Sequence, residues 1–338
     1  MNTPPPTTEL DLLALTTLVA ATWGLPPLTL TYQALGFGSH HWRAEAAGGV
    51  GECWFVTADE GGGVAGSPAM LARALGTAAA VRDLAGIAEA IAPIPARDGA
   101  LLATMNDGRW TVAVYPWLAV EPSSFGAFAS DDDRADAMRL VARIHAATPL
   151  VPAGLPRRDA LAIAHRADLE RALQRLDTPW EVGPFAEPAR LQLRDAEASL
   201  NAALAEYDRL VSSVQADPAP WVITHGEPHP GNIVRLRSGG IAIVDWDTCA
   251  LAPRERDLWQ LLPQDTGLEA GLAAYRAVSG DIPVSADALA LYRLWWDLSE
   301  VAIYTRWFCR AHADAEDMRV GFGGLQEAME NLTQAFPA

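Results

Sequence analysis

The chain has 338 residues, of which half are hydrophobic, so it is long enough for two domains with a large core. Its formal net charge of −17 at pH 7 argues against nucleic acid and anionic membranes as main partners. No stretch of the sequence approaches the roughly 18 apolar residues of a membrane span, and no secretion signal is evident at its start. The three cysteines are widely spaced and odd in number, which favours reduced thiols in a cytoplasmic protein: Cys53, Cys249 and Cys309.

The first third of the chain is rich in predicted strands. An amphipathic helix over Leu10–Trp23 ends at a Gly-Leu-Pro-Pro stop, and a second helix is expected over Ser67–Leu84. Turn residues such as Asp98-Gly99 and Asp107-Gly108 separate the later strands. The expected strands are Leu28–Ala34, Arg43–Ala46, Cys53–Thr57, Ile87–Pro95, Ala100–Met105 and Trp110–Tyr115.

The remaining two thirds are mainly helical, with one embedded hairpin. Three aspartates favour the start of the first of these helices through the helix dipole. A Gly-Phe-Gly-Gly run over residues 321–324 is expected to turn the chain into its last helix. The expected helices are Asp131–Ala147, Leu161–Leu176, Ala186–Gln215, one beginning at Ala252, Leu268–Val278, Ser285–Cys309 and Leu325–Phe336.

The embedded hairpin, residues 221–247, carries the polar residues that suggest chemistry. An apolar strand over residues 221–224 leads into a polar loop, and a second strand begins at Asn232 and turns at a Ser-Gly-Gly sequence. A third strand ends in Asp245 and Asp247. The hairpin therefore presents carboxylate and amide oxygens at one edge.

The spacing of these residues suits phosphoryl transfer. Asn232 follows Glu227 by five residues, and Asp245 follows Asn232 by thirteen. Protein kinases place a catalytic carboxylate, an asparagine and a metal-binding aspartate in this order. A carboxylate orients and deprotonates the acceptor hydroxyl, while hard oxygen ligands hold Mg²⁺ against the nucleotide phosphates.

A zinc site is the competing interpretation, because His225 and His229 are four residues apart with Glu227 between them. A zinc-protease motif of this kind requires both histidines on one face of a helix. Two prolines and two glycines within residues 226–231 make a helix here very unfavourable. We therefore interpret His225 as a structural residue of the loop, and His229 as a candidate to line the site.

The combined motif, HGEPHPGN followed by IVDWD, resembles the aminoglycoside phosphotransferase family, whose usual pattern is HGDxHxxN and then D-[WF]-[DEG]. The resemblance implies a two-lobed, kinase-like α+β fold and Mg-dependent phosphorylation of small-molecule hydroxyls with ATP or GTP. It implies Glu227 as the catalytic base, in place of the usual Asp, and Asn232 and Asp245 as metal ligands. Asp247 would assist a second metal or the loop, and Asp257 would brace the catalytic loop from behind.

The same resemblance implies a nucleotide site in the first part of the chain. The Gly-rich turn with Gly36, Gly38 and Ser39 would cover the phosphates with backbone N–H groups. Trp117 and Leu118 would lie at the hinge that binds adenine. We expect a β-rich N-lobe over residues 1–115 and a larger, mainly helical C-lobe over residues 116–338.

The chain departs from the kinase pattern because it contains no lysine. The third strand should carry a lysine for the α- and β-phosphates, and the helix after it should carry a glutamate partner, but both are missing. Three interpretations remain open. An arginine (Arg43, Arg73 or Arg82) replaces the lysine, the nucleotide binds through the backbone, the metal and the Gly-rich turn alone, or the protein binds nucleotide without transferring phosphate.

A last stretch, residues 296–304, combines carboxylates with aromatic side chains. Asp297 and Glu300 are flanked by Trp296 and Tyr304, which suits either a solvated face or a wall for the amines and hydroxyls of a sugar-like substrate. This stretch and the Gly-rich turn resemble the spectinomycin-phosphotransferase branch, which implies an aminocyclitol antibiotic as a cationic small-molecule substrate and a role in antibiotic resistance. The alternatives are a kinase of another small alcohol or amino sugar and an inactive nucleotide-binding protein.

Overall fold

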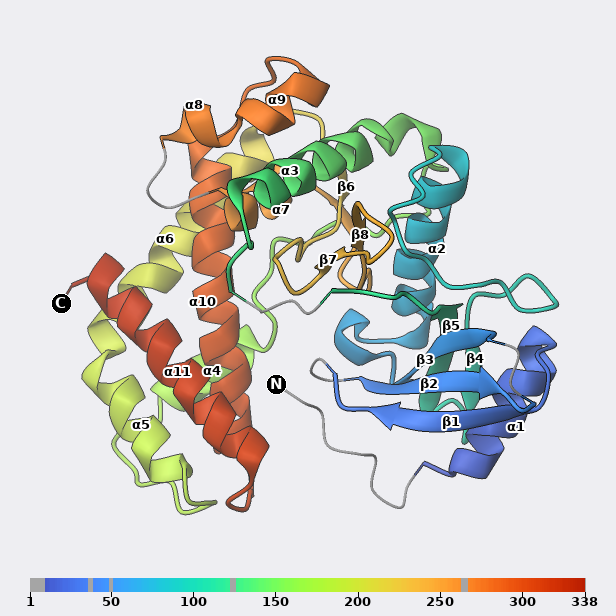
Figure 1. The fold of residues 1–338 in the computed structure, drawn as a ribbon. Helices are drawn as coiled ribbons and strands as arrows, with labels where there is room; N and C mark the ends of the chain where they lie inside the picture. Colours follow the sequence, from blue (N-terminus) through green and yellow to red (C-terminus); the bar gives the residue numbers. More distant parts are fainter. Residues whose placement is uncertain (1–9, 36–38, 49–50, 122–125, 263–266, 338) are drawn as a thin grey trace. The chain divides into compact units, whose positions relative to one another are not determined.

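The structure is a computed structural model that describes residues 10–35, 39–48, 51–121, 126–262 and 267–337 (Figure 1). The chain divides into two compact units, each built from two segments. Unit 1 comprises Met1–Arg158 and Trp221–Ile282, and unit 2 comprises Asp159–Pro220 and Pro283–Ala338. The expected lobe boundary after residue 115 falls inside unit 1 and stays a prediction. Within the described ranges, none of the helices is both long and apolar enough to cross a membrane.

Unit 1 begins with an antiparallel five-stranded sheet in the order β1-β2-β3-β5-β4. Helix α1 (Leu12–Trp23) packs its apolar side on the sheet, and Leu15 and Val19 are fully buried there. Asp11 caps the start of this helix, and Gly24 ends it with a φ of 70°. The strands are β1 Leu28–Gln33, β2 His40–Ala46, β3 Cys53–Glu60, β4 Ala103–Met105 and β5 Trp110–Pro116.

The two faces of β3 differ in polarity. Val56 and Ala58 are fully buried in the core that α1 covers. Because side chains alternate along a strand, Thr57 and Asp59 lie on the opposite face. The register pairs Asp59 with Thr111 of β5, so this second face is partly polar.

The rest of unit 1 surrounds the predicted catalytic hairpin. Strands β7 and β8 form this hairpin, while β6 pairs with a further short strand, β9, that was not predicted from the sequence. The N–H of Ile91 donates to Ile243 O of β8, and the N–H of Glu121 donates to Arg235 O of β7. The elements are η1 Gly63–Ala65, α2 Pro68–Leu84, α3 Asp131–Ala146, η2 Thr148–Leu150, β6 Val222–Thr224, β7 Ile233–Arg235, β8 Ile241–Ile243, β9 Ala250–Ala252, α7 Glu255–Leu261, α8 Leu268–Gly271 and α9 Ala273–Ser279.

Unit 2 is helical and is organised around its longest helix, α10. This helix packs on α4, α6 and α11 (Figure 1). Its buried residues are apolar along most of its length. Ser285 caps its start through a hydrogen bond from Ala288 N. The helices are α4 Arg166–Leu173, α5 Ala186–Asp195, α6 Glu197–Ala216, α10 Ala286–Phe308 and α11 Glu316–Ala335.

The α+β class is confirmed, but several predicted elements are wrong in detail. Ile87–Pro95 is not a strand, because its two prolines lack the N–H groups that a ladder needs. The helix predicted over Ala186–Gln215 is interrupted at Ala196, and the one over Leu268–Val278 is divided at Leu272. Only Arg166–Leu173 is helical within the helix predicted over Leu161–Leu176.

The predicted Gly-rich turn before the last helix is also wrong, because α11 runs through it. A Cβ on Gly324 would lie 2.7 Å from the Tyr304 ring, and one on Gly321 would lie 3.0 Å from the Trp307 ring. These glycines therefore serve close helix packing, with α11 lying against aromatic side chains of α10.

Candidate active site

The β7–β8 hairpin brings two predicted metal ligands together. Val244 N donates to Asn232 O over 3.0 Å, so the strand ends that carry Asn232 and Asp245 lie next to each other. Asp245 has a φ of 67°, a left-handed conformation that is uncommon outside glycine. Such backbone strain is often found at functional positions, which agrees with the role predicted for Asp245.

Asn232 also fixes the loop that carries the predicted base. Its Nδ2 donates to Glu227 O over 3.0 Å, and the residue is 8% exposed. This contact uses the amide nitrogen and not Oδ1, the atom predicted to bind a metal. The carbonyl contact fixes the backbone of Glu227, while its half-buried carboxylate lies 3.9 Å from His229 Nε2.

Asp245 and Asp247 lie close enough for each carboxyl group to affect the pKa of the other. Asp245 is exposed, whereas Asp247 is half-buried. Burial raises the pKa of Asp247 well above its ordinary value. The negative charges of Asp245, Glu227 and then Asp59 raise this pKa further. The site therefore concentrates negative charge, which a bound cation would offset.

The backbone of the catalytic loop is held from behind by Asp257 of α7. Its Oδ2 accepts from His225 N over 2.9 Å, and its Oδ1 accepts from Gly226 N over 2.6 Å. His145 of α3 lies 3.0 Å from Asp257 through Nε2 and 2.8 Å from the Tyr275 hydroxyl through Nδ1. Burial alone would raise the pKa of Asp257, but the hydrogen bond and charge of His145 lower it overall. These contacts support the structural role predicted for Asp257.

His225 is neutral in this arrangement. It is fully buried, its Nε2 donates to Val244 O over 2.9 Å, and its Nδ1 accepts from Glu227 N over 3.3 Å. Burial lowers the pKa of His225 to about 4, against the opposing charge of Asp257. A neutral ring with both nitrogens engaged in the loop supports a structural role rather than metal binding.

Arg256, which was not predicted from the sequence, also stabilises this loop through hydrogen bonds. Its Nη1 donates to Thr224 Oγ1 and its Nη2 donates to Thr248 O, each over 3.0 Å. A Cβ on Gly226 would lie 2.3 Å from the Arg256 guanidinium, so a larger residue there would displace this group. The Arg-Glu-Arg-Asp run at the start of α7 was the available signal, because charged residues are seldom buried unless they are paired.

His229 lies beside the predicted base in this loop. Its Nδ1 accepts from Gly231 N over 3.2 Å, and burial lowers its pKa to about 4. Its place near Glu227 is compatible with the predicted contact to substrate, which stays a prediction.

The predicted phosphate-binding turn is described only in part, because Gly36 and Gly38 lie outside the described residues. Ser39 Oγ donates to Asp59 Oδ1 on the polar face of β3. Asp59 is 7% exposed, and burial raises its pKa to about 6, with a further contribution from the charge of Asp245. Burial also raises the pKa of Tyr115, and the negative charges of Asp59, Asp245 and Asp247 raise it further.

Asp59 is a functional candidate that was not predicted from the sequence. A carboxylate that follows the apolar part of a strand was the signal that could have identified it. It accepts a hydrogen bond from Ser39, which precedes β2, and the charge of Asp245 raises its pKa, so Asp59 of the sheet lies near the hairpin of unit 1.

The predicted hinge residues lie beside aromatic and cationic groups. The Trp117 ring is 6.3 Å from the Phe55 ring, and the Arg43 guanidinium lies 5.0 Å from the Trp117 centroid. His41 stacks on Phe55 with the ring centroids 5.1 Å apart. Trp117 and Leu118 are both half-buried, and their contact with adenine stays a prediction.

The three arginines that could replace the lysine differ in their present contacts. Arg73 donates to the carbonyl oxygens of residues 154–156. Arg82 donates to Asp83 and to the carbonyl oxygens of residues 92 and 93. Arg43 pairs with Glu45 over 3.0 Å and is the one of the three that belongs to the five-stranded sheet, so it is the candidate that we retain.

The other four predicted substrate residues lie on α10 in unit 2. Burial raises the pKa of both Asp297 and Glu300, and Asn331 Nδ2 donates to Asp297 Oδ1 over 3.1 Å. Glu327 of α11, which was not predicted from the sequence, adds a third negative charge to this group. Trp296 and Tyr304 are half-buried on the same helix. The arrangement is compatible with amine recognition, and this assignment stays a prediction.

The donor set of the hairpin fits a hard cation such as Mg²⁺. Asn232 Oδ1 and the carboxylates of Asp245 and Asp247 are oxygen ligands, which Mg²⁺ prefers. In the described ranges, no three His, Cys, Asp or Glu side chains form a metal-holding group. Few protein ligands suit Mg²⁺ at a nucleotide site, because phosphate oxygens and water complete its coordination.

Comparison with known families gives a match over most of the chain. A sequence model described as "Phosphotransferase enzyme family" matches residues 54–292, which include the whole hairpin. A comparison with curated protein sequences gave no match.

Comparison with solved structures shows the fold. Spectinomycin phosphotransferase APH(9)-Ia, in complex with ADP and spectinomycin, has a TM-score of 0.77 and 17% identity, covering 96% of this chain and 98% of that chain. A microcompartment-associated aminopropanol kinase has a TM-score of 0.66 and 17% identity, covering 96% and 97%. An aminoglycoside phosphotransferase from Alicyclobacillus acidocaldarius has a TM-score of 0.56 and 16% identity, covering 94% and 93%. These similarities confirm the predicted kinase-like fold.

Proposed function

Because the chain belongs to the phosphotransferase enzyme family, we propose that it transfers the γ-phosphoryl group of a nucleoside triphosphate to a hydroxyl of a small cationic molecule of the aminocyclitol or aminoglycoside type. The observation that carries the proposal is the contact of the Glu227 loop with Asn232, whose strand end adjoins the strand end that carries Asp245. In this proposal, the loop before β7 carries the base, and the adjoining ends of β7 and β8 carry the two oxygen ligands for a cation.

In the proposed reaction, Glu227 orients the acceptor hydroxyl and accepts its proton. The hydroxyl oxygen forms the new bond to the γ-phosphorus, and the bond from that phosphorus to the β–γ bridging oxygen breaks. Mg²⁺, held by Asn232 and Asp245, would supply positive charge to the phosphates. Asp257 positions Glu227 indirectly, since it fixes the backbone N–H groups of the two residues before the base.

The proposed substrate class is based on the carboxylates of Asp297, Glu300 and Glu327 in unit 2. A group of three carboxylates on α10 and α11 would stabilise a bound ammonium group, and such a group would lower the raised pKa values of Asp297 and Glu300. The names of two structurally similar proteins, a spectinomycin phosphotransferase and an aminopropanol kinase, both suggest amino alcohols for the assay.

An inactive nucleotide-binding protein is the second candidate, and Asp59 is the observation that favours it. A buried carboxylate on the polar face of β3 adds negative charge to the strand in which a kinase carries a lysine. The phosphates of a nucleotide would then depend on a cation, on Arg43 and on backbone N–H groups.

The proposal is tested by nucleoside diphosphate release from Mg-ATP or Mg-GTP with spectinomycin, aminoglycosides and aminopropanol. We expect one of these compounds to stimulate release, and Glu227→Ala to lower that rate by about 10²- to 10⁴-fold, as for loss of a general base. Asp245→Asn should abolish the stimulated release. Glu52→Gln, which removes a charge from an exposed side chain of the same unit, should leave the release unchanged. Nucleotide binding without stimulated release would instead support the inactive candidate.

A further inference from the structure

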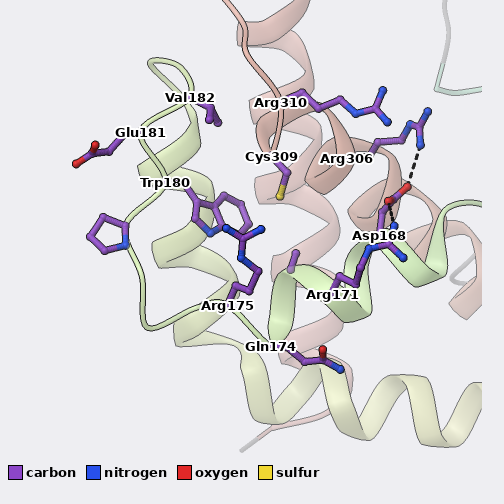
Figure 2. A pocket seen from close by; sticks show the side chains of 12 residues that line it. Asp168, Arg171, Gln174, Arg175, Trp180, Glu181, Val182, Arg306, Cys309 and Arg310 are labelled. Atoms are coloured by element: carbon purple, nitrogen blue, oxygen red, sulfur yellow. Dashed lines mark hydrogen bonds and ion pairs between the residues drawn. The ribbon is translucent and has the colours of Figure 1, made fainter.

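A cavity of about 450 Å³ lies in unit 2, and none of the predicted catalytic, nucleotide-binding or substrate-binding residues lines it. It is lined by α4, the loop that follows this helix, and the end of α10 (Figure 2). All of these segments belong to the same compact unit, so the cavity is formed by one packed group of helices.

The lining of this cavity is basic although the unit is acidic. The two segments of unit 2 contain 19 Asp and Glu residues but only 10 arginines. Four of these arginines line the cavity together with only two carboxylates: Arg171, Arg175, Arg306, Arg310, Asp168 and Glu181. Like charges around one space repel each other, and an anion would relieve this repulsion.

The carboxylates of the lining compensate only part of this charge. Arg306 Nη1 donates to Asp168 Oδ2 over 2.9 Å, and Arg171 pairs with the other oxygen of Asp168. One carboxylate is therefore shared by two guanidinium groups. Glu181 points away from the other labelled side chains in Figure 2.

The two remaining arginines are available to a ligand. Among the described residues, the guanidinium groups of Arg175 and Arg310 have no hydrogen bond or ion pair, and both residues are exposed. Burial raises the pKa of the Cys309 thiol to about 11, and the charge of Arg175 opposes this shift, so Arg175 lies near the end of α10. Arg306 and Arg310 extend in the same direction from this end in Figure 2.

One wall of the cavity is apolar. Trp180 is 9% exposed and lines the space with Pro179 and Val182. An apolar wall lowers the local polarity and strengthens charge interactions with guanidinium groups. Arginine also matches the oxygens of phosphate in a bidentate manner.

We propose that this cavity binds a multiply charged phosphate-type anion through Arg175 and Arg310. The chemistry allows two sources, an inorganic polyphosphate or a phosphorylated small molecule, and the apolar wall suits the organic part of the second. The site is independent of the proposed transfer reaction, because it uses none of the residues of the hairpin.

Calorimetric titration of the full chain with pyrophosphate and, separately, with fructose 1,6-bisphosphate tests the proposal. Arg175→Gln and Arg310→Gln should each weaken binding about tenfold, the effect of losing one charged hydrogen bond. Both residues are exposed, so the variants should fold, and thermal melting checks this.

Arg293→Gln is the matched control, because Arg293 is exposed on α10, does not line the cavity, and its replacement changes the net charge equally. The proposal requires binding that the cavity variants weaken and the control leaves unchanged. Absence of binding for both probes, or equal loss in the control, would overturn it. Binding of one probe alone identifies the source of the phosphate.

Discussion

Asp59 shows how one buried ionisable side chain affects both the site and the stability of the fold. It lies on the polar face of β3, accepts a hydrogen bond from Ser39, and experiences the charge of Asp245. Its pKa is raised from an ordinary value of 3.8 to about 6, mainly by burial. The folded protein therefore binds this proton more tightly than the unfolded chain does, and the resulting stability is lost as the pH rises from 3.8 to about 6.

Replacing Asp59 with Asn should stabilise the protein at pH 7.5, because the amide carries no charge to desolvate. We expect a gain of roughly 1–3 kcal/mol in the free energy of unfolding at this pH, from about 1.4 kcal/mol for each pKa unit. The gain should shrink at a pH below 3.8, where the carboxyl group is protonated in both states. Urea unfolding at a series of pH values measures it.

Glu52→Gln is the control for this prediction, because Glu52 is exposed in the same unit and the change removes the same charge. A gain of equal size in the control would mean that the net charge of the chain, and not burial at position 59, is responsible. A loss of stability in Asp59→Asn would show that its contact with Ser39 outweighs the cost of burial.

Among the elements of the fold, the conformation of the loop after β6 depends on its close contact with α7 at Gly226. Gly226 has a φ of 105°, donates its N–H to Asp257, and lies against the guanidinium of Arg256. Two requirements therefore coincide at one residue: a left-handed backbone and space for a charged side chain. Either requirement alone favours glycine.

Gly226→Ala should lower phosphotransfer by roughly tenfold or more and destabilise the protein, because its Cβ would displace Arg256 and shift the backbone next to Glu227. Gly239→Ala separates strain from displacement, because Gly239 has a φ of 94° but a Cβ there meets nothing within 4 Å. It should cost only the backbone strain, about 1–2 kcal/mol. Steady-state rates and urea midpoints of both variants measure the difference, and equal effects would exclude the clash as the cause.

In the molecule as a whole, the local motif was more predictable than the arrangement around it. The order of Glu227, Asn232 and Asp245 in a strand-loop-hairpin could be predicted, because short-range spacing determines which side chains share an edge. Charged residues in apolar surroundings indicate Asp59 and Arg256 as candidates, but their contacts with Ser39 and Thr224 could not be predicted, since these partners lie 20 and 32 residues away. Gly321 and Gly324 were interpreted as part of a turn for the same reason: only the packing of α10 on α11 explains them.

The absence of lysine gives a prediction for the whole chain. Reductive methylation modifies amines, and this sequence offers none apart from a chain terminus. Nucleotide binding and phosphotransfer should therefore survive complete methylation, whereas a lysine-dependent phosphotransferase treated in parallel should lose both.

Arginine modification supplies the complementary experiment. Phenylglyoxal, which reacts with guanidinium groups, should inactivate the protein, and Mg-nucleotide should slow that inactivation because Arg43 would be covered by the phosphates it contacts. Arg43→Gln should then remove the protection, while Arg293→Gln, a change on an exposed face of α10, should leave it intact. Inactivation that nucleotide does not slow would indicate that backbone N–H groups and the cation bind the phosphates without any arginine, since a bound nucleotide can shield only the side chains that it touches.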